Sequence, residues 1–350
     1  MGCDRVAPAL AAAQSAMKSV APSTLILRGS EVAALMDPAA FLAAVEAGFR
    51  AYASGGAEVP LPMHIPASGG GFHAKGARVT LDRDYAGVKL NGNFPGNPQR
   101  NGLPTIQGVM LLCDATDGSL LAIIDSIEIT LRRTAAASAL AARYLARADS
   151  TSIAICGCGQ QGRAQLTALA DVFRLTRATA WDIDAERAGV FAHEMRDALG
   201  IEVTVVADVR DATWGSDIVV TATSAQSPFL GTSCVSPGTF VAAVGADSAQ
   251  KSEIAPDLLA NSKVVADVLA QCVVMGDLHH AIEAGRVSAA SVHAELGDLV
   301  VGRKSGRASA HEITVFDSTG VAVQDVASAA WIYQRAIAAN VGMFVSLGVS

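Results

Sequence analysis

The stretch that decides the fold is residues 153–162, which read IAICGCGQQG. Its apolar start predicts a buried strand, and the G-x-G-x-x-G pattern predicts a tight turn into a helix. In such a loop the first glycine permits the turn, the second lets a pyrophosphate approach the backbone, and the third lets the helix pack on its strand. The N–H groups of the helix N-terminus then favour phosphate. The expected dinucleotide contacts are Gly157, Gly159, Gln160, Gln161 and Gly162.

A carboxylate after the next predicted strand supports this interpretation. Asp182 follows that strand about 20 residues after Gly162, where a Rossmann-type domain places the group that binds the adenosine ribose. Because a carboxylate there would repel a 2′-phosphate, we expect NAD rather than NADP, and Asp184 is a second candidate for the role. The alternative is a glycine turn followed by aspartates that only cap a helix. Further expected cofactor contacts are Thr105, Thr221 and Thr223.

The sequence around the glycine loop alternates between strand and helix. Strands are predicted at 153–156, 178–181, 203–206, 218–221, 240–244, 263–266 and 314–316, and helices at 160–173 and 185–199. This alternation predicts a parallel sheet covered on both faces. The predicted fold class is α/β, with a Rossmann-type domain over residues 141–321.

The N-terminal half has a different pattern. A strand is expected at 24–27, helices at 38–54 and 129–148, and loop or edge strand at 55–71. Short apolar runs at 86–90, 108–113 and 120–124, each bounded by turn signals, predict an antiparallel sheet. A last helix over 323–345 is expected to return to this part of the chain. We therefore expect an α+β domain from residues 23–140 and 322–350, with residues 1–22 as an extension.

Composition excludes several classes of protein. The 350 residues suggest two domains, since a typical domain has about 150. A net charge of −7 argues against a nucleic-acid binder, and no apolar run reaches the roughly 18 residues of a membrane span. The six cysteines form no C-x-x-C pair and no zinc-site spacing, so we expect neither a metal site nor a disulfide framework, and a cytoplasmic setting. The low charged fraction of 17% suggests a buried subunit interface.

Three charged residues stand next to or within apolar segments. Lys89 lies in a predicted strand, where a buried lysine shifts its pKa readily; the alternative is a lysine pointing to water. Arg133 begins an alanine-rich helix and could hold a carboxylate with its guanidinium, or it could lie on the surface. Asp247 follows an apolar strand at the edge where ligands bind, or it only caps a helix.

Taken together, the segments resemble the ornithine cyclodeaminase/mu-crystallin family. The matching pieces are Gly87-Val88-Lys89 with Asn91-Gly92, Leu103-Pro104-Thr105, Arg133-Thr134-Ala135-Ala136, Gly157-x-Gly159-x-Gln161, Ala243-Val244-Gly245-Ala246-Asp247 and Gly320-Val321-Ala322-Val323-Gln324-Asp325. They occur in order over about residues 25–345. The resemblance implies a homodimer, in which the N-terminal half and the C-terminal helix bind substrate and form the subunit interface. It also implies that Lys89 and Asp247 are catalytic and that Arg133 binds the substrate carboxylate.

One departure from the family affects the substrate. Many members carry a further substrate-binding arginine in a segment like P-L-R-T, but residues 60–66 here read PLPMHIP. The segment 72–78 reads FHAKGAR, where many members have Met-Pro. We therefore expect Lys75 or Arg78 to bind the substrate anion, or the pocket to take a different substrate.

The first hypothesis for function is NAD-dependent reduction of a small α-imino acid to the L-amino acid, or the reverse dehydrogenation. Arg133, with Lys75, would hold the α-carboxylate, and Lys89 and Asp247 would move protons. If Lys75, Arg78, Lys89 and Arg133 converge, they suggest a substrate with a second carboxylate, such as iminosuccinate.

Two alternatives stay open. Ornithine cyclodeamination, which converts L-ornithine to L-proline and ammonia without net redox change, needs an acidic pocket for the distal ammonium. The basic side chains near Lys75 disfavour it. A non-catalytic, mu-crystallin-like protein that binds NAD(P)H is the second alternative, and the presence of proton-transfer groups argues against it.

Overall fold

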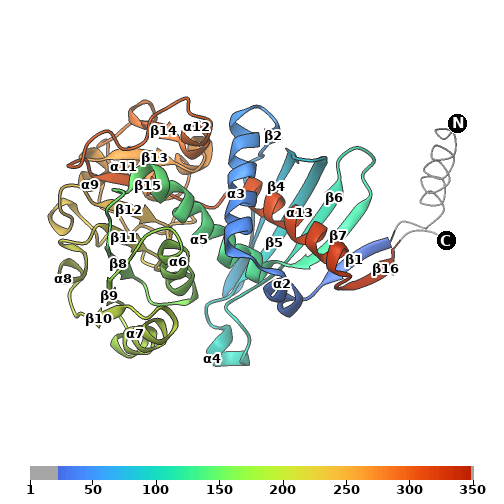
Figure 1. Ribbon diagram of the computed structural model, residues 1–350, viewed down its shortest axis with the longest axis horizontal. Coiled ribbons are helices and arrows are strands. Elements are labelled where there is room, and N and C mark those ends of the chain that lie inside the picture. Colours follow the sequence, from blue (N-terminus) through green and yellow to red (C-terminus); the bar gives the residue numbers. More distant parts are fainter. Residues whose placement is uncertain (1–22, 348–350) are drawn as a thin grey trace, which may run out of the picture.

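Two eight-stranded sheets lie side by side, with helices between and around them (Figure 1). The computed structural model describes residues 23–347, so the predicted extension over residues 1–22 lies outside the described residues. One sheet is entirely parallel and the other is mostly antiparallel. The predicted fold class, α/β with a Rossmann-type domain and a second α+β domain, is confirmed. The domain boundaries placed at residues 141 and 322 stay a prediction.

The parallel sheet has the order β10-β9-β8-β11-β12-β15-β13-β14. Its strands are β8 (Ser152–Cys156), β9 (Arg177–Trp181), β10 (Glu202–Val205), β11 (Ile218–Thr221), β12 (Phe240–Ala243), β13 (Lys263–Ala266), β14 (Ala294–Glu295) and β15 (Thr314–Asp317). The strand order reverses between β8 and β11. Ligands of open α/β sheets bind at such a reversal, outside the carboxyl ends of the strands. We therefore expect a ligand to bind at the carboxyl ends of β8, β11 and β12.

Both faces of the parallel sheet are buried. Val220 and Ala242 belong to one apolar cluster, whereas their neighbours Val219 and Val241 belong to another. Burial on both sides explains why these strands are continuous apolar runs. The covering helices are α6 (Gln160–Ala170), α7 (Ala185–Leu199), α8 (Val209–Thr213), α9 (Pro256–Ala260), α10 (Leu269–Cys272), α11 (Asp277–Glu283) and α12 (Leu296–Val300), with short turns η2 (Thr232–Cys234) and η3 (Ala289–Ser291).

The second sheet has the order β16-β1-β7-β6-β5-β4-β2, with β3 paired to β4. Its strands are β1 (Ser23–Leu27), β2 (Ala57–Glu58), β3 (Met63–Ala67), β4 (Gly70–Thr80), β5 (Asp84–Asn93), β6 (Ile106–Asp114), β7 (Leu120–Asp125) and β16 (Met343–Ser346). All neighbours run antiparallel except β1 and β7. The predicted antiparallel sheet is confirmed.

Helices pack on one face of this sheet. They are α2 (Gly29–Leu35), α3 (Pro38–Ala53), α5 (Ser126–Leu145) and α13 (Ala322–Ala339), while α4 (Asn97–Asn101) lies in the loop from β5 to β6. Figure 1 shows the red helix α13 lying along the sheet beside α3, which confirms the predicted return of the C-terminal helix. Within residues 23–347 no single helix is long and apolar enough to cross a membrane; α2 and α3, bent by 100°, meet those limits only as a pair.

Two segments differ from the sequence prediction. Residues 70–80 form the long strand β4, whereas loop or edge strand was expected up to residue 71 and no particular strand between residues 72 and 85. The last helix ends at Ala339 rather than near residue 345, because Asn340 takes a left-handed conformation with φ of 52° and stops it. The chain then forms β16, which pairs with β1.

The opposite face of the second sheet is apolar and exposed. Along β5 and β6 the inward side chains, such as Tyr85 and Met110, are buried, because side chains alternate along a strand. The outward ones are not: Val88 is 46% exposed, Leu90 38% and Leu111 37%. We call this surface the outer sheet face. A sheet with one uncovered apolar face is unusual for a monomer and typical of a protein interface.

Candidate active site

The glycine loop between β8 and α6 has the geometry that a pyrophosphate site requires. Gly157 has a φ of 102°, and a Cβ there would lie 2.5 Å from the Ala222 carbonyl oxygen. A Cβ on Gly162 would lie 2.2 Å from the Gly157 carbonyl oxygen, so α6 packs directly on the loop. Gly159 caps the helix and has open space around it. The loop therefore offers free backbone to a ligand at one position and close packing at the other two.

Two aspartates follow β9 beside this loop. The Asp182 side chain is 5% exposed; its carboxylate accepts from the Cys158 N–H at 2.8 Å and from the Asp184 N–H at 3.0 Å. Asp184 caps α7 by accepting from the Arg187 N–H at 3.1 Å. The Arg187 guanidinium lies 3.4 Å from Asp182 and 3.3 Å from Asp184. Asp182 thus ties β9 to the glycine loop, and Arg187 offsets part of the negative charge.

The ends of β11 and β12 are joined by a buried carboxylate. Glu253 is fully buried and accepts from the Thr221 hydroxyl at 2.7 Å and from the Gly245 N–H at 2.8 Å. Its other oxygen accepts from the Thr223 N–H and the Thr223 hydroxyl, both at 2.6 Å. Two of the three threonines expected to contact the cofactor, Thr221 and Thr223, therefore lie at the carboxyl edge of the sheet, with their hydroxyls bonded to Glu253.

A buried charge cluster joins β5, α5 and α13. The Lys89 ammonium donates to Asp325 Oδ1 at 2.8 Å, and Arg133 Nε donates to the same oxygen at 2.9 Å. Arg133 also donates to the Gln324 side chain at 2.9 Å. Lys89, Arg133 and Asp325 are each less than 5% exposed. Neither Lys89 nor Arg133 points to solvent, so the surface alternative for each is excluded.

Asp325 is the counter-ion of both Lys89 and Arg133. Burial, and after it the positive charge of Arg133, lower the pKa of Lys89 to about 7 against the attraction of Asp325. Burial opposes the ionisation of Asp325, but Arg133 and Lys89 outweigh it and lower the pKa of that carboxyl. The site therefore holds a permanently charged guanidinium and an amine that changes charge near neutral pH.

Lys75 links the two sheets at the same place. Its ammonium extends from β4 and donates to the Thr319 and Gly320 carbonyls at 3.0 and 2.8 Å, just after β15. A Cβ on Gly320 would lie 2.6 Å from the Arg133 guanidinium, so Lys75 and Arg133 approach the same turn. Lys75 is also paired in register with Lys89 on β5. Burial lowers the pKa of Lys75, with a nearby Asp247 opposing the change.

Asp247 adds a second carboxylate to the buried charge cluster and Lys75. It lies in the loop after β12, with 53% of its side chain exposed, and bonds to Lys251 at 2.6 Å. Partial desolvation works against its ionisation, but the charges of Lys251 and Lys75 outweigh this and lower the pKa of Asp247. His73, two residues before Lys75 on β4, stacks on His64 with ring centroids 4.6 Å apart. Five charged groups therefore meet at the carboxyl edge of the parallel sheet. They are the cations of Lys75, Lys89 and Arg133 and the carboxylates of Asp325 and Asp247.

Comparison with known proteins identifies one family. A model of the ornithine cyclodeaminase/mu-crystallin family matches residues 23–340. The chain belongs to this family.

Its relatives include proteins named as different dehydrogenases and reductases. An alanine dehydrogenase from Archaeoglobus fulgidus is 38% identical over 319 residues, which is 91% of this chain and 97% of that protein. A solved archaeal alanine dehydrogenase dimer with bound NAD covers 93% of this chain and 100% of its own, with 37% identity and a TM-score of 0.89. The iminosuccinate reductase of Paracoccus denitrificans in complex with NAD⁺ covers 92% and 99%, with 31% identity and a TM-score of 0.86.

A third solved relative carries both cofactor and an amino acid. The Thermococcus litoralis Δ1-pyrroline-2-carboxylate reductase, in complex with NADH and L-proline, is 33% identical. It covers 92% of this chain and 100% of its own length, with a TM-score of 0.87. The two-sheet architecture described above is thus that of family members solved with a nicotinamide cofactor.

Arg78 does not join the charge cluster of this family member. Its guanidinium bonds to Asp84 at 3.0 Å and reaches Glu58 at 3.5 Å. Because Lys75 and Arg78 are an odd number of positions apart on β4, their side chains leave opposite faces of the strand. The expected convergence of four basic groups is therefore wrong for Arg78, and a role of Lys75 and Arg133 in binding the substrate anion stays a prediction.

Three more residues were expected to contact the cofactor. Gln160 and Gln161 lie at the glycine loop, and Thr105 lies apart from it. Gln160 and Gln161 are the first residues of α6, and the Gln161 amide donates to the Leu131 carbonyl at 3.5 Å, which links the loop to α5. Thr105 lies in the loop from β5 to β6, where its carbonyl accepts from the Phe94 N–H at 2.8 Å. A cofactor contact of Thr105 stays a prediction.

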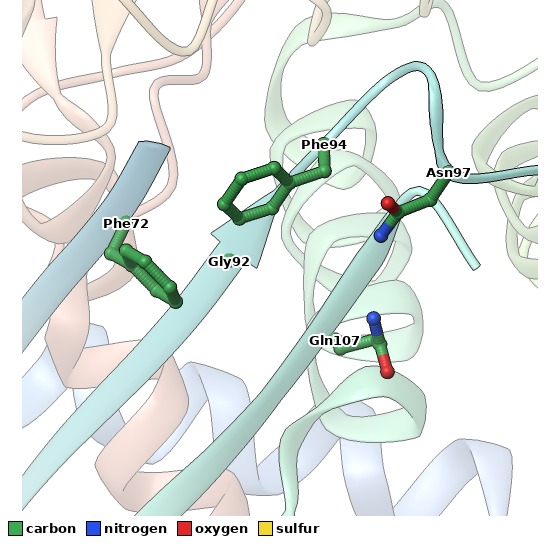
Figure 2. A pocket seen from close by; sticks show the side chains of 5 residues that line it. All are labelled: Phe72, Gly92, Phe94, Asn97 and Gln107. Atoms are coloured by element: carbon green, nitrogen blue, oxygen red, sulfur yellow. The ribbon is translucent and has the colours of Figure 1, made fainter. Parts of the chain in front are cut away.

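A separate pocket of about 330 Å³ opens on the outer sheet face. Figure 2 shows its lining, with the Phe72 and Phe94 rings on one side and the Asn97 and Gln107 amides on the other, around Gly92. The two rings meet edge to face at 5.4 Å. No titratable side chain lines this pocket, so it is distinct from the charge cluster.

Two residues that organise the site were not assigned a role from sequence. Asp325 belongs to one of the segments that resemble the family, and no pattern in the sequence marks Glu253. An acidic residue in the first turn of an apolar helix, as Asp325 is in α13, was the available signal. Its pairing with Lys89 spans 236 positions and follows only from the fold.

One group of potential metal ligands lies outside the charge cluster. Within residues 23–347, ligand atoms of His279, His280 and Glu283 lie within 4.8 Å of one another on α11. The second histidine already bonds to the Lys251 carbonyl at 2.9 Å. The expectation of a protein without metal therefore stays a prediction.

Proposed function

We propose that this protein catalyses the NAD-dependent reduction of a small α-imino acid to the L-amino acid, and the reverse dehydrogenation. The observation that carries the proposal is the convergence of Lys75, Lys89 and Arg133 with Asp325 and Asp247 at the carboxyl edge of the sheet that bears the glycine loop. Relatives named as alanine dehydrogenase and iminosuccinate reductase support it.

The glycine loop would hold the cofactor pyrophosphate. Gly159 leaves space for it, and the N-terminus of α6 supplies N–H donors. Asp182 and Asp184 would receive the adenosine ribose, which favours NAD over NADP, although Arg187 reduces that preference. When bound, the nicotinamide supplies or accepts the hydride.

Arg133 and Lys75 would hold the substrate α-carboxylate. Arg133 uses Nε and Nη1 for Asp325 and Gln324, which leaves Nη2 to donate to an anion. The Lys75 ammonium has used two of its three protons on carbonyls. Both cations are held by the protein before substrate arrives, so little ordering is required on binding.

Lys89 and Asp247 would move the protons of the reaction. Reduction of an imine adds one hydride to carbon and one proton to nitrogen. With a pKa of about 7, Lys89 can donate that proton when charged and accept it in the reverse direction when neutral. Asp247, ionised and partly exposed, would exchange protons with solvent or orient water.

The sequence suggested four basic groups for a substrate with two carboxylates, but the structure leaves fewer positive charges available for the second carboxylate. Arg78 is engaged elsewhere, and Asp325 offsets one of the charges on Lys89 and Arg133. Lys75 is the remaining cation for a distal carboxylate. A dicarboxylic imino acid such as iminosuccinate is therefore one member of the substrate panel, beside monocarboxylic ones.

We further propose that the protein is a homodimer formed through the outer sheet face. Val88, Leu90 and Leu111 form an apolar row across β5 and β6, and Phe72 extends it on β4. An archaeal alanine dehydrogenase of the same architecture is described as a dimer, which supports this proposal.

The test is to follow NADH oxidation with ammonia and a panel of 2-oxo acids, together with preformed cyclic imines, and to repeat it with NADPH. L-Ornithine with NAD runs in parallel, with proline assayed directly. Stoichiometric NADH oxidation with one oxo acid would support the proposal and name the substrate class. Proline formed from ornithine without net NADH change would overturn it in favour of cyclodeamination.

A further inference from the structure

We propose that Glu253 is a positioning residue for this reaction: it fixes the loop of residues 244–253 so that Asp247 faces the charge cluster. The inference rests on the role proposed above for Asp247. Glu253 itself is fully buried and points at backbone and threonine side chains, so it acts through the loop rather than on substrate.

The contacts of Glu253 join three segments that meet where the nicotinamide end of a cofactor would lie. Thr221 ends β11, Thr223 follows it, and Gly245 follows β12. A Cβ on Gly245 would lie 2.4 Å from Glu253 Oε1 and 2.5 Å from the Thr223 carbonyl oxygen. The start of the 244–253 loop is therefore packed against the carboxylate that ends it.

The four donors around Glu253 require a carboxylate. Each oxygen accepts from one hydroxyl and one backbone N–H, and a backbone N–H cannot reverse its role. A glutamine would turn its NH₂ group toward the N–H of either Thr223 or Gly245, whichever way the amide is oriented. Burial raises the pKa of Glu253, and the donors from Thr223 and Thr221 oppose that rise.

Helix α11 holds the other end of the loop. Asp277 Oδ1 accepts from the Glu253 N–H at 2.7 Å and from the Ile254 N–H at 2.9 Å. His280 Nε2 lies 2.9 Å from the Lys251 carbonyl oxygen, and Lys251 bonds to Asp247. Asp247 thus lies on a segment held at both ends, although its own side chain is half-exposed. Such a segment places a functional group without burying it.

Asp217 offers a matched control on the same strand. It directly precedes β11, at the opposite edge of the sheet from Thr221, and is mostly buried. Its carboxylate accepts from the N–H groups of Thr151 and Ser152 at 2.9 and 3.0 Å, and from the Ser152 hydroxyl at 2.8 Å. The other Asp217 oxygen pairs with the Arg147 guanidinium at 2.7 Å, so Asp217→Asn removes an ion pair as well as backbone and hydroxyl contacts at the far end of the same strand.

The first experiment compares kcat, KM and thermal stability of these two variants on the imino acid that the wild-type protein reduces. Glu253→Gln is expected to lower kcat by about ten- to hundred-fold, as a misplaced catalytic group does. Asp217→Asn is expected to lower the melting temperature and leave kcat within about two-fold of wild type. Equal losses of kcat in both variants, or unchanged kcat in Glu253→Gln, would overturn the inference.

A double-mutant cycle with Asp247→Asn tests the coupling. If Glu253 acts through Asp247, the loss of kcat in the double variant is expected to be well below the product of the single losses. A multiplicative loss would show that Glu253 acts elsewhere and would contradict the inference alone. Unchanged kcat in Asp247→Asn would instead show that the proposed function assigns Asp247 wrongly. Should Glu253→Gln not fold, Thr223→Val removes one hydroxyl donor, and the cycle is repeated with that variant.

Discussion

In the proposed reaction, the charge of Lys89 decides the direction of proton transfer. Its pKa is lowered to about 7, so the charged form prevails below that pH and the neutral form above it. We expect kcat/KM for imine reduction to fall as pH rises through about 7, and the reverse dehydrogenation to rise over the same range. Rate profiles in both directions measure this. Lys89→Arg stays charged, so an inflection near pH 7 that survives in this variant would assign it to another group.

Asp325 is the residue on which the stability of the charge cluster depends. Asp325→Asn leaves Lys89 and Arg133 buried without a counter-ion, and we expect it to lower the free energy of unfolding by about 3–5 kcal/mol. Lys89→Met leaves the pair between Arg133 and Asp325 intact and is expected to cost much less. Denaturant unfolding of both variants compares them. A similar loss in the two would show that the carboxylate does not balance two cations.

At the scale of the element, the glycine loop separates a folding role from a binding role. Gly159 has a φ of −79° and open space where a Cβ would lie, so Gly159→Ala is expected to keep the melting temperature and lose NADH affinity. In Gly162→Ala the Cβ would meet the Gly157 carbonyl at 2.2 Å, so the melting temperature is expected to fall. Thermal scans and NADH fluorescence titrations measure both. Full NADH affinity in Gly159→Ala would place the pyrophosphate elsewhere.

The elements that periodicity could predict were those with one dominant pattern. The helix over 185–199 and the strands at 218–221 and 263–266 have the predicted bounds, because continuous apolar runs and a capping aspartate mark them. The strand β4 was not predicted, because its glycines interrupt the apolar pattern. Gly70 is required there by contact: a Cβ would lie 2.3 Å from the Asn93 carbonyl oxygen.

At the scale of the whole molecule, the proposed homodimer depends on the outer sheet face. Val88→Glu places a charge at the centre of the apolar row and is expected to convert the dimer to monomer. Val190 on α7 is exposed to a similar degree, at 48%, but lies on the other part of the molecule, so Val190→Glu is the matched control. Sedimentation of the two variants measures the outcome. A dimer that persists in Val88→Glu would exclude this face as the interface.

The candidate site was predictable in its parts but not in its connections. Lys89, Arg133 and Asp247 stood out from sequence because charged groups next to apolar segments are costly. That Lys89 and Arg133 share one oxygen of Asp325 could not be read from spacing, since the partner is 192 positions from Arg133. Arg78 has a different cause: its partner Asp84 is only six positions away, but the strand pair β4–β5 that brings the two together was not predicted. Local pattern gives the chemistry of a side chain, and topology gives its partner.

The pairing of β1 with β16 has a consequence for biosynthesis. The parallel sheet is built from one uninterrupted stretch of chain, so it can form while synthesis continues. The second sheet receives β16 and α13, with Asp325, from the last part of the chain. Until that part leaves the ribosome, Lys89 and Arg133 have no counter-ion. All strands of the parallel sheet therefore leave the ribosome before Asp325 does, and the buried charge cluster can form only after α13 has been synthesised.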